Sequence, residues 1–490
     1  MNTFLLYSGE HRVAGLLERL TIPRGKRAPA VTWERRGAVI VWGEDVSSLL
    51  PQTGFVLNHP VPAGRCRTKR TREELLSLHG LRPAASGAAG YAYQFRVPVF
   101  HLEALALFGA TSNASLQLQQ AARLVPIYAE LDAAAADKRG KQAMREAVKA
   151  VYALGLDFGL VDLGFPSGGD GKPEIVNVRP YPELNGRLAG LYAEAIERFD
   201  RELRAEQTRK GRVLLGADPE FLLADDRGRL VPASRYLPKT GEAGCDVLTL
   251  RGETRYPLAE LRPEPATDPR QLARNIRRAM LAAAARIDDE RLHWVAGAMP
   301  ATGFSIGGHI HMSRIWLNSY LLRTLDNYLA LPLILAEQEG KSARRRPVYG
   351  FLGDFRRKKH GGFEYRTLPS WLVSPMLARG VLALSALIAA HYRELPQRPL
   401  AGLAVQRHYY EGDKQALLPV VTELWGDLER LSGYEALAAD LKPFKASLLA
   451  LESWDERQDF RPAWKIPPFD GGEIHEAPIR AIIGSDSRNR

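Results

Sequence analysis

Four short segments of this chain carry polar or charged residues two positions apart, with an apolar neighbour between them. The segments are Asp218-Pro219-Glu220, Glu260-Leu261-Arg262, His309-Ile310-His311 and Glu364-Tyr365-Arg366. A β-strand directs residues i and i+2 to the same face, with a rise of about 3.3 Å per residue. Each segment, as a strand, would therefore present two functional groups on one face. We expect the four strands to form a sheet whose apolar back is covered by helices and whose front carries carboxylates, imidazoles and guanidinium groups.

The residue types on this front are those that bind divalent metal ions. Mg²⁺ and Mn²⁺ prefer carboxylate oxygens, and Mn²⁺ also accepts imidazole readily. Two ions with a nucleoside triphosphate between them would need about six such ligands. The candidates are Asp218, Glu220, Glu260, Glu264, His309 and Glu364. The pattern therefore predicts a site for two ions of Mg²⁺ or Mn²⁺ that acts on a polyanionic substrate.

Each pair also has a simpler interpretation. An acidic pair two residues apart is most often a solvated sheet face, and a single strand histidine is most often a core or surface residue. Glu364 and Arg366 could form a cross-strand ion pair. The recurrence of the pattern over four segments, each with Gly or Pro at its edges, favours a functional site.

Composition limits the class of protein. The 490 residues suffice for two or three domains, and 67 basic against 56 acidic residues give a formal charge of +11, which favours anionic partners. The two cysteines, Cys66 and Cys245, indicate neither a disulfide framework nor a cysteine zinc site. The first 15 residues lack the features of a signal peptide, and apolar runs such as 381–390 are too short to cross a bilayer. We expect a cytoplasmic protein without a membrane partner.

Three regions are expected along the chain. Residues 1–206 read as short strands and helices, 212–398 contain the four segments, and 399–490 are mostly helical with a polar tail. Within the second region, Asp268 before Pro269 predicts the start of a helix that runs to about residue 287. A basic stretch at 341–360 is expected to be a loop that closes over a triphosphate. Its alternative is a solvated or nucleic-acid-facing run of charge.

The four segments occur in the order found in glutamine synthetase-like carboxylate–amine ligases, and residues 212–395 resemble more closely the phage-type amidoligases of that superfamily. The first strand of glutamine synthetase has two glutamates around the proline, whereas this chain has the shorter Asp218. The resemblance implies an α+β fold with an antiparallel sheet backed by helices. It also implies that Glu220, Glu260 and Glu264 hold one metal ion, and that Asp218, His309 and Glu364 hold the other.

The resemblance further implies an ATP-dependent ligase. ATP would phosphorylate a carboxylate, and an amine would then displace phosphate from the acyl phosphate. Arg366 would face the γ-phosphate, because a guanidinium group makes paired, permanently charged hydrogen bonds. The expected catalytic residues are Arg366 and Arg356, and the expected ATP-binding residues are Arg344, Arg356, Lys358 and Arg366.

The first region resembles an ATP-grasp domain in the hairpin formed by 154–162 and 174–182. Asp162 matches an acidic metal-binding position of that family, but Asn177 stands where the family has Glu, and Arg179 where it has Asn. The interval from 81 to 93 is also too short for the usual nucleotide-clamping strands and lysine. We therefore expect a degenerate domain without ATP turnover. In the alternative interpretation, Asp162 is a structural carboxylate that pairs with Arg179.

Two other functions use the same features. The ligand set would also suit a metal-dependent hydrolase or nucleotidyl-type enzyme, and the basic charge would suit a nucleic-acid-binding protein. The basic residues are not interleaved with aromatic residues, which makes nucleic acid the less favoured partner. The expected partners are a small-molecule or peptide carboxylate and an amine, and the sequence leaves the oligomeric state open.

Overall fold

The computed structural model describes residues 3–27, 37–44, 50, 55–84, 90–110, 127–250, 253–359 and 361–467. The predicted polar tail at 468–490 lies outside this part of the chain. The chain divides into two compact units, one of Met1–Arg209 with Asn318–Tyr320, the other of Lys210–Leu317 with Leu321–Arg490. Both units mix helices with β-sheets, and the sheets are antiparallel except for one parallel sheet in the first unit.

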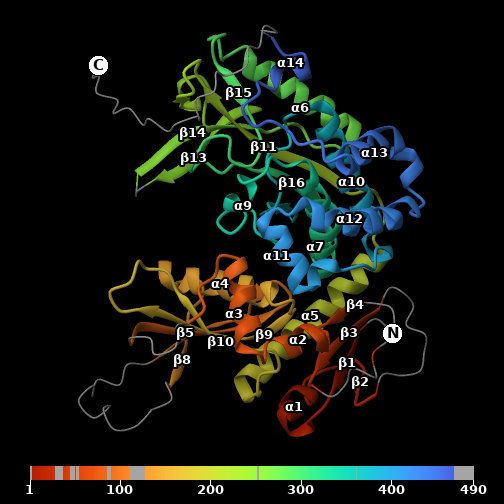
Figure 1. The fold of residues 1–490 in the computed structure, drawn as a ribbon. Coiled ribbons are helices and arrows are strands. Elements are labelled where there is room, and N and C mark those ends of the chain that lie inside the picture. The colour runs from red at the N-terminus through yellow and green to blue at the C-terminus, as the bar shows by residue number, and fades with distance from the viewer. Residues whose placement is uncertain are drawn as a thin grey trace. The chain divides into compact units, whose positions relative to one another are not determined.

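The first unit contains two sheets (Figure 1). A parallel four-stranded sheet has the order β2-β1-β3-β4, and a six-stranded antiparallel sheet has the order β10-β9-β5-β7-β8 with β6 paired to β5. Helix α4 packs against β5 and β9 through buried alanines. The elements are β1 (Thr3–Tyr7), α1 (Glu10–Leu17), β2 (Arg24–Gly25), β3 (Ala38–Trp42), β4 (Phe55–Leu57), α2 (Pro60–Arg65), α3 (Lys69–Leu78), β5 (Tyr91–Phe100), β6 (Glu103–Ala104), β7 (Leu107–Ala110), β8 (Tyr128–Leu131), α4 (Lys138–Ala153), β9 (Phe158–Pro166), β10 (Glu174–Arg179) and α5 (Gly186–Thr208).

The second unit is built on an eight-stranded sheet of order β13-β14-β11-β16-β18-β17, with β12 and β15 also paired to β11. Its strands are β11 (Leu214–Ala224), β12 (Leu230–Val231), β13 (Ala243–Leu250), β14 (Glu253–Leu261), β15 (His293–Val295), β16 (Gly308–Ser313), β17 (Phe355–Arg357) and β18 (Phe363–Tyr365). The four segments with alternating polar residues thus lie on the adjacent strands β14, β11, β16 and β18. This confirms that they share one antiparallel sheet.

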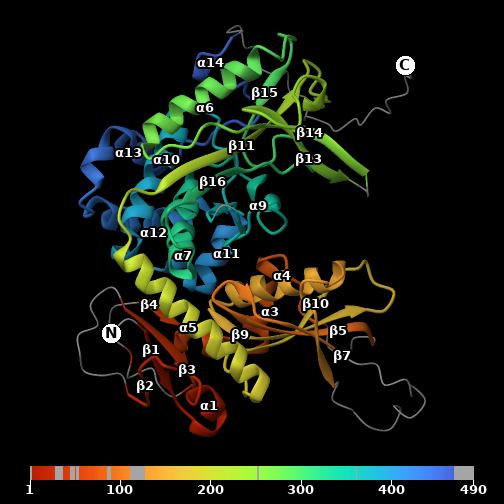
Figure 2. The same cartoon turned by 180° about the vertical axis from the view of Figure 1, so that it is seen from behind.

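Most helices of this unit lie on one side of the sheet, and the β13–β14 hairpin extends away from them, as Figures 1 and 2 show. The helices are α6 (Pro269–Ala284), α7 (Ser319–Leu325), α8 (Leu331–Leu333), α9 (Ser342–Arg345), α10 (Pro375–His391), α11 (Leu403–Glu411), α12 (Lys414–Glu429), α13 (Tyr434–Leu449) and α14 (Arg461–Trp464). Helix α6 begins as predicted, because the side chain of Asp268 accepts a hydrogen bond from the backbone N–H of Arg270 and Pro269 occupies the first turn. It packs against β11, β13 and β14, so its buried apolar side supports the strands that carry the site.

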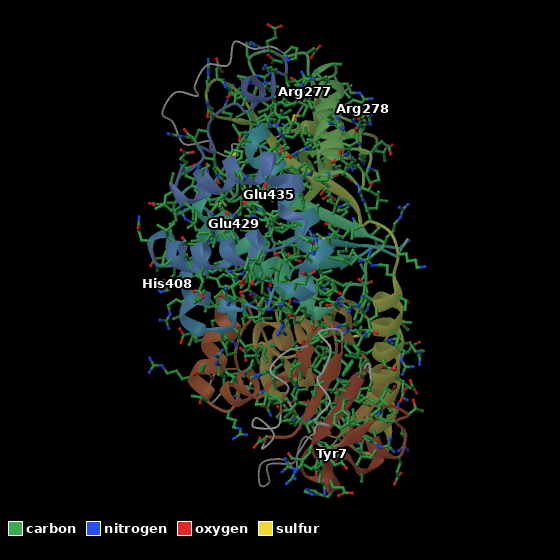
Figure 3. All side chains as sticks on the ribbon, turned by 90° about the vertical axis from the view of Figure 1, so that its right-hand side faces the viewer. Tyr7, Arg277, Arg278, His408, Glu429 and Glu435 are labelled. Atoms are coloured by element: carbon green, nitrogen blue, oxygen red, sulfur yellow. The ribbon has the colours of Figure 1, made fainter. Side chains whose placement is uncertain are left out.

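The region after residue 399 belongs to the same compact unit as the sheet. Helix α13 packs against α10 and α12, and Lys445 on α13 lies 2.5 Å from Glu429 on α12. Figure 3 labels Glu429 and, on α6, Arg277 and Arg278. Arg277 donates to the carbonyl oxygen of Trp464 at 3.1 Å, which ties α6 to the last described segment.

One helical stretch, Pro375–Glu394, is long and apolar enough to cross a membrane by length and composition. However, 67% of its most apolar window is buried inside the protein. Helix α10, which forms most of this stretch, packs against α6 and α13. Its apolar character is therefore explained by its place in the core. The cytoplasmic location stays a prediction.

Candidate active site

Strand register places the polar residues of β11 opposite those of its two neighbours. Asp218 lies opposite His309 of β16, and Glu220 lies opposite Glu260 of β14. Directly opposed residues of an antiparallel pair project from the same face, and so do residues two apart on one strand. The carboxylates of β11 therefore share a face with His309 and Glu260.

The same face continues across β16 to β18 and β17. His311 lies opposite Glu364, which in turn lies opposite Arg356. The intervening residues, such as Ile310 and Tyr365, lie on the other face and are fully buried. The sheet thus has the apolar back and polar front that the sequence predicts.

Close packing of a glycine fixes the start of β16. A Cβ atom on Gly308 would lie 2.5 Å from Nε1 of Trp371 and 2.6 Å from the carbonyl oxygen of Pro369. The same Nε1 donates a 2.9 Å hydrogen bond to the carbonyl oxygen of Gly308. Because only glycine fits here, the backbone that leads into His309 is held against the segment after β18.

Three residues from three strands form the first ligand group, Asp218, His311 and Glu364. One potential ligand atom from each lies within 4.8 Å of the other two. Nε2 of His311 lies 2.9 Å from Oδ2 of Asp218. Two carboxylates and an imidazole are a donor set suited to Mn²⁺ and acceptable to Mg²⁺.

The second ligand group consists of three carboxylates, Glu220, Asp246 and Glu260, again within 4.8 Å of one another. Oε2 of Glu220 accepts a 2.7 Å hydrogen bond from the backbone N–H of Gly307, and Glu260 pairs with Arg262. Asp246 comes from β13, at an irregularity in its pairing with β14. Three convergent carboxylates with a single paired cation form an oxygen-rich site for a hard divalent ion.

His309 lies beside the first ligand group without being one of its three members. Its Nδ1 is 3.1 Å from Oδ1 of Asp218 and 3.2 Å from Oε1 of Glu364. Its Nε2 is 2.7 Å from the hydroxyl of Tyr349, which also lies 3.3 Å from Oε1 of Glu220. His309 and Tyr349 therefore connect the two ligand groups.

Arg366 follows β18 directly and lies beside Glu364. Its Nε is 2.9 Å from Oε1 of Glu364, and its Nη1 is 3.8 Å from Oδ1 of Asp354. The guanidinium carbon is 5.4 Å from the centre of the Tyr349 ring. These contacts orient a permanent cation next to the first ligand group.

Two further basic residues approach Glu364 from β17 and the turn after it. Nζ of Lys358 lies 2.6 Å from Oε2 of Glu364, and Nη1 of Arg356 lies 3.6 Å from the same oxygen. The Arg356 side chain is 56% exposed, so it is accessible to a ligand. Arg344, the remaining residue predicted to bind ATP, is an exposed residue of α9, with no side-chain hydrogen bond or ion pair recorded within the described residues.

The structure does not bring Glu264 into either ligand group. It lies beyond the end of β14, where it is exposed and its backbone carbonyl accepts a hydrogen bond from Asn275. Asp246 occupies the third position of the second group instead. The spacing of Glu264 from Glu260 could not predict the position of Glu264. The strand ends at Leu261, so the alternation of side chains between the two faces does not continue to residue 264.

The basic stretch at 341–360, expected to be a loop that closes over a triphosphate, does not offer Arg345 and Arg346 for that purpose. Arg345 is buried and donates to the carbonyl oxygens of Ile306, Thr367 and Leu368. Arg346 is also buried and pairs with Glu337 at 2.5 Å. These two guanidinium groups form hydrogen bonds and an ion pair in the protein interior, so they do not face solvent or nucleic acid.

The pKa values of the acidic residues shift in opposite directions in the two ligand groups. Burial would raise the pKa of Asp218, but hydrogen bonds from His309 and His311 outweigh it and hold that pKa well below its usual range. Burial raises the pKa of Glu220. Burial, followed by the negative charge of Asp218, raises the pKa of Glu260 to about 8. Crowding and burial of the three carboxylates thus favour bound protons, and a divalent cation would displace those protons.

Buried charged groups crowd together at this face. His311 Nε2, Glu364 Oε2 and Arg366 Nε are buried, and each lies within 2.9 Å of an oppositely charged atom. Convergent carboxylates and imidazole are the ligands that divalent ions take, and guanidinium and ammonium groups beside them suit a phosphate. The donor set and these atoms fit divalent ions with a phosphate group beside them.

Asp162, the acidic residue of the predicted ATP-grasp-like hairpin, is paired with two arginines. Asp162 on β9 receives hydrogen bonds from Nε of Arg96 and Nη2 of Arg179, both at 2.7 Å. The pairing with Arg179 is the alternative that the sequence left open, and Arg96 is a second partner that the sequence did not suggest. Two cations on one carboxylate leave it unsuited to a metal ion.

Comparison with known proteins gives a family match over the second unit. The family described as phage phiEco32-like COOH.NH2 ligase type 2 matches residues 215–466, more than half of the 490 residues. No curated protein sequence matches this chain.

Several solved structures of ligases are distantly similar. They include the ATP-grasp ligase PsnB with a minimal precursor (13% identity, 40% of this chain and 99% of that one, TM-score 0.29). A bifunctional glutathione synthetase from Pasteurella multocida matches at 11% identity (49% and 48% of the two chains, TM-score 0.33). The D-alanine–D-alanine ligase from Bacillus anthracis matches at 11% identity (41% and 98%, TM-score 0.28). Similarity at this level does not assign a function, whereas the family match covers both ligand groups and the arginine beside them. The chain belongs to the phage phiEco32-like COOH.NH2 ligase type 2 family.

Proposed function

We propose that this carboxylate–amine ligase forms its amide bond through an acyl phosphate on the polar face of the eight-stranded sheet. The observation that carries the proposal is the placement of two ligand groups on one face, with Arg366 beside Glu364. A substrate carboxylate oxygen would attack the γ-phosphorus of ATP and release ADP. The amine would then attack the acyl carbon, lose a proton and release phosphate.

The residues that would hold divalent ions are those of the two ligand groups, and they differ in part from the sequence expectation. Asp218, His311 and Glu364 would bind one ion, while Glu220, Asp246 and Glu260 would bind the other. Bound ions would neutralise the negative charge of the triphosphate and the carboxylate that must approach each other. We retain two ions of Mg²⁺ or Mn²⁺ as the proposed cofactors.

The basic residues around Glu364 would bind and orient phosphate groups. Glu364 and Asp354 orient the guanidinium group of Arg366, which favours a catalytic role for Arg366 next to the transferred phosphoryl group. The exposed Arg356 would contact the nucleotide phosphates or the substrate. Lys358 would neutralise negative charge on the phosphates. Arg344 remains a candidate only for a peripheral contact.

The first unit is proposed to be an ATP-grasp-like domain that has lost its own nucleotide site, since Asp162 is paired with two arginines. Catalysis would then reside in residues 212–398, with the helices after 399 as support. The proposed substrates are a small-molecule or peptide carboxylate and an amine.

A screen of carboxylate and amine pairs for ADP release tests this function. The proposal expects ADP and phosphate in equal amounts, and only when Mg²⁺, a carboxylate and an amine are all present. Release of AMP and pyrophosphate would indicate nucleotidyl chemistry instead. Salt-sensitive DNA binding without any turnover would favour a nucleic-acid-binding protein.

A further inference from the structure

The antiparallel sheet of the first unit carries a cluster of charged residues that lies outside the proposed ligase site. Arg96 of β5 and Asn177 of β10 lie directly opposite Asp162 of β9, on its two sides. Arg179 follows two residues after Asn177 on β10. Opposed residues project from the same face of a sheet, and so do residues two apart on one strand. Arg96, Asp162 and Arg179 therefore share one face, where they form what we call the arginine cluster.

The charges of the arginine cluster do not balance. Asp162 offers one negative charge to two guanidinium groups, each 2.7 Å away, so one positive charge is in excess. The neighbouring pair of Arg187 on α5 with Glu130 on β8 is balanced, with two hydrogen bonds of 2.7 and 2.6 Å between the same two side chains. A structural ion pair needs a single cation, and a second guanidinium group beside the first adds repulsion between like charges. An anion bound at the cluster would remove that repulsion.

Both arginines keep N–H groups that a ligand can reach. Arg96 uses Nε and Arg179 uses Nη2 to donate to Asp162. Their other terminal nitrogens have no acceptor within the part of the chain that the structure describes, and the two side chains are 26% and 37% exposed. The guanidinium group of Arg96 also lies 4.2 Å from the centre of the Tyr128 ring. The ring and Asp162 hold this guanidinium group in a fixed orientation before any ligand binds.

The charge of the surroundings indicates which anion fits. Both groups of described residues that could hold a metal ion lie in the second unit. A nucleoside triphosphate would bring several negative charges to the arginine cluster, where the described residues offer no metal ion to offset them. A carboxylate carries one negative charge, which equals the excess positive charge, and its two oxygens match the planar fork of a guanidinium group.

We propose that Arg96 and Arg179 form a binding site for a single carboxylate group, with Asp162 as the residue that orients the two guanidinium groups. The carboxylate would come from an acidic side chain of a peptide or from a small organic acid. The site goes beyond the proposed ligase chemistry, because binding here forms and breaks no covalent bond. The first unit then recognises a carboxylate-bearing ligand and does not bind a nucleotide.

The test is nuclear magnetic resonance of the full chain labelled with ¹⁵N-arginine, which observes the cluster separately from the second unit. The Nε–H signals of Arg96 and Arg179 are assigned with Arg96→Lys and Arg179→Lys. The probes are acetyl-Gly-Glu-Gly-amide, which has one carboxylate, the same peptide with Gln in place of Glu, and acetate. We expect saturable shifts of both signals with the Glu peptide or with acetate, and none with the Gln peptide. Tighter binding of the peptide would identify a peptide as the source, and tighter binding of acetate a small acid.

Arg179→Gln removes the excess positive charge and should weaken carboxylate binding, measured at the Arg96 signal, by about tenfold or more, the scale of hydrogen bonds to a charged group. Arg82→Gln is the matched control. Arg82 forms an exposed, balanced pair with Asp170 in the same unit, so its loss should leave the affinity unchanged.

Three results would overturn the inference alone. They are no saturable shift at Arg96 and Arg179 in the unmodified protein, equal shifts with the Glu and Gln peptides, and unchanged affinity in a folded Arg179→Gln protein. Tighter binding of MgATP than of either carboxylate at these signals would also overturn the proposed loss of the nucleotide site in the first unit. The ADP-release screen of the ligase is a separate measurement, so failure of the carboxylate site and failure of the ligase function can be told apart.

Discussion

His311 of β16 and Glu364 of β18 lie directly opposite each other, and with Asp218 of β11 they bring three potential ligand atoms within 4.8 Å. The relationship depends on register, because a shift of one residue on either strand would move its polar side chain to the apolar face. In a carboxylate–amine ligase, this register is what joins distant parts of the sequence into one site.

Replacing Glu260 by Gln should weaken metal binding in the second ligand group. The change keeps the shape of the side chain but removes one of three charges that converge there. We expect Mg²⁺ affinity, measured by calorimetry, to fall by about tenfold or more. Glu264→Gln is the control, since Glu264 is exposed and outside both groups. Equal effects of the two changes would restore Glu264 as a ligand and remove the distinction drawn here.

Stabilisation by Mg²⁺ should increase with pH. Burial raises the pKa of Glu260 to about 8, so between its ordinary value of 4.5 and about 8 the folded metal-free protein holds a proton that the unfolded chain has lost. The stability of the metal-free protein therefore falls as pH rises through this window. Mg²⁺ competes with that proton and binds more tightly at higher pH.

The corresponding measurement is the rise in the thermal unfolding midpoint on adding Mg²⁺ at pH 6, 7 and 8. The rise should be largest at pH 8 and should depend less on pH in Glu260→Gln, where Glu220 is the remaining carboxylate with a raised pKa. A midpoint shift that is constant over this range would show that Glu260 does not exchange a proton for the ion.

Arg366→Lys should lower turnover without unfolding the protein. Lysine keeps a positive charge near Glu364 and Asp354 but lacks the planar fork that Arg366 directs between them. We expect ADP release to fall by about a hundredfold or more, with MgATP still bound. Thermal unfolding of the same preparation provides the check. If stability and activity are lost together, Arg366 is a structural ion-pair partner, and near-normal turnover removes it from the mechanism.

Asp162→Asn should affect the stability of the first unit and not the chemistry. Asp162 is only 13% exposed and neutralises Arg96 and Arg179, so its loss leaves two cations without their shared partner. We expect a loss of about 1–3 kcal/mol in the free energy of unfolding, with ATP affinity unchanged.

The matched control for this change is Asp170→Asn, which breaks an exposed pair with Arg82 and should lower the free energy of unfolding less than Asp162→Asn does. Weaker ATP binding by a folded Asp162→Asn protein would contradict a degenerate first unit.

The sequence predicted the sheet face because alternation is a local property. Residues two apart on a strand share a face whatever the partner strand is, so Asp218 and Glu220 could be assigned together before any pairing was known. The order of the strands, with β11 between β14 and β16, depends on long-range packing, and the sequence did not predict it.

The residues that the sequence missed lack such a local signal. Asp246 lies after a glycine-containing segment and reaches the second ligand group through an irregularity in the pairing of β13 with β14. Tyr349 follows Arg345 and Arg346 in a stretch that reads as a basic loop. The three carbonyl contacts of Arg345 and the buried pair of Arg346 with Glu337 hold this stretch inward, where Tyr349 reaches His309.

The central claim is that a carboxylate is activated by ATP as an acyl phosphate on this sheet face. The most direct measurement supplies a carboxylate substrate labelled with ¹⁸O on both oxygens and follows the label by mass spectrometry after one turnover. The account predicts one ¹⁸O atom in the released phosphate, and the same transfer about a hundredfold or more slower in Arg366→Lys. Label in AMP, or unlabelled phosphate beside an amide product, would contradict it.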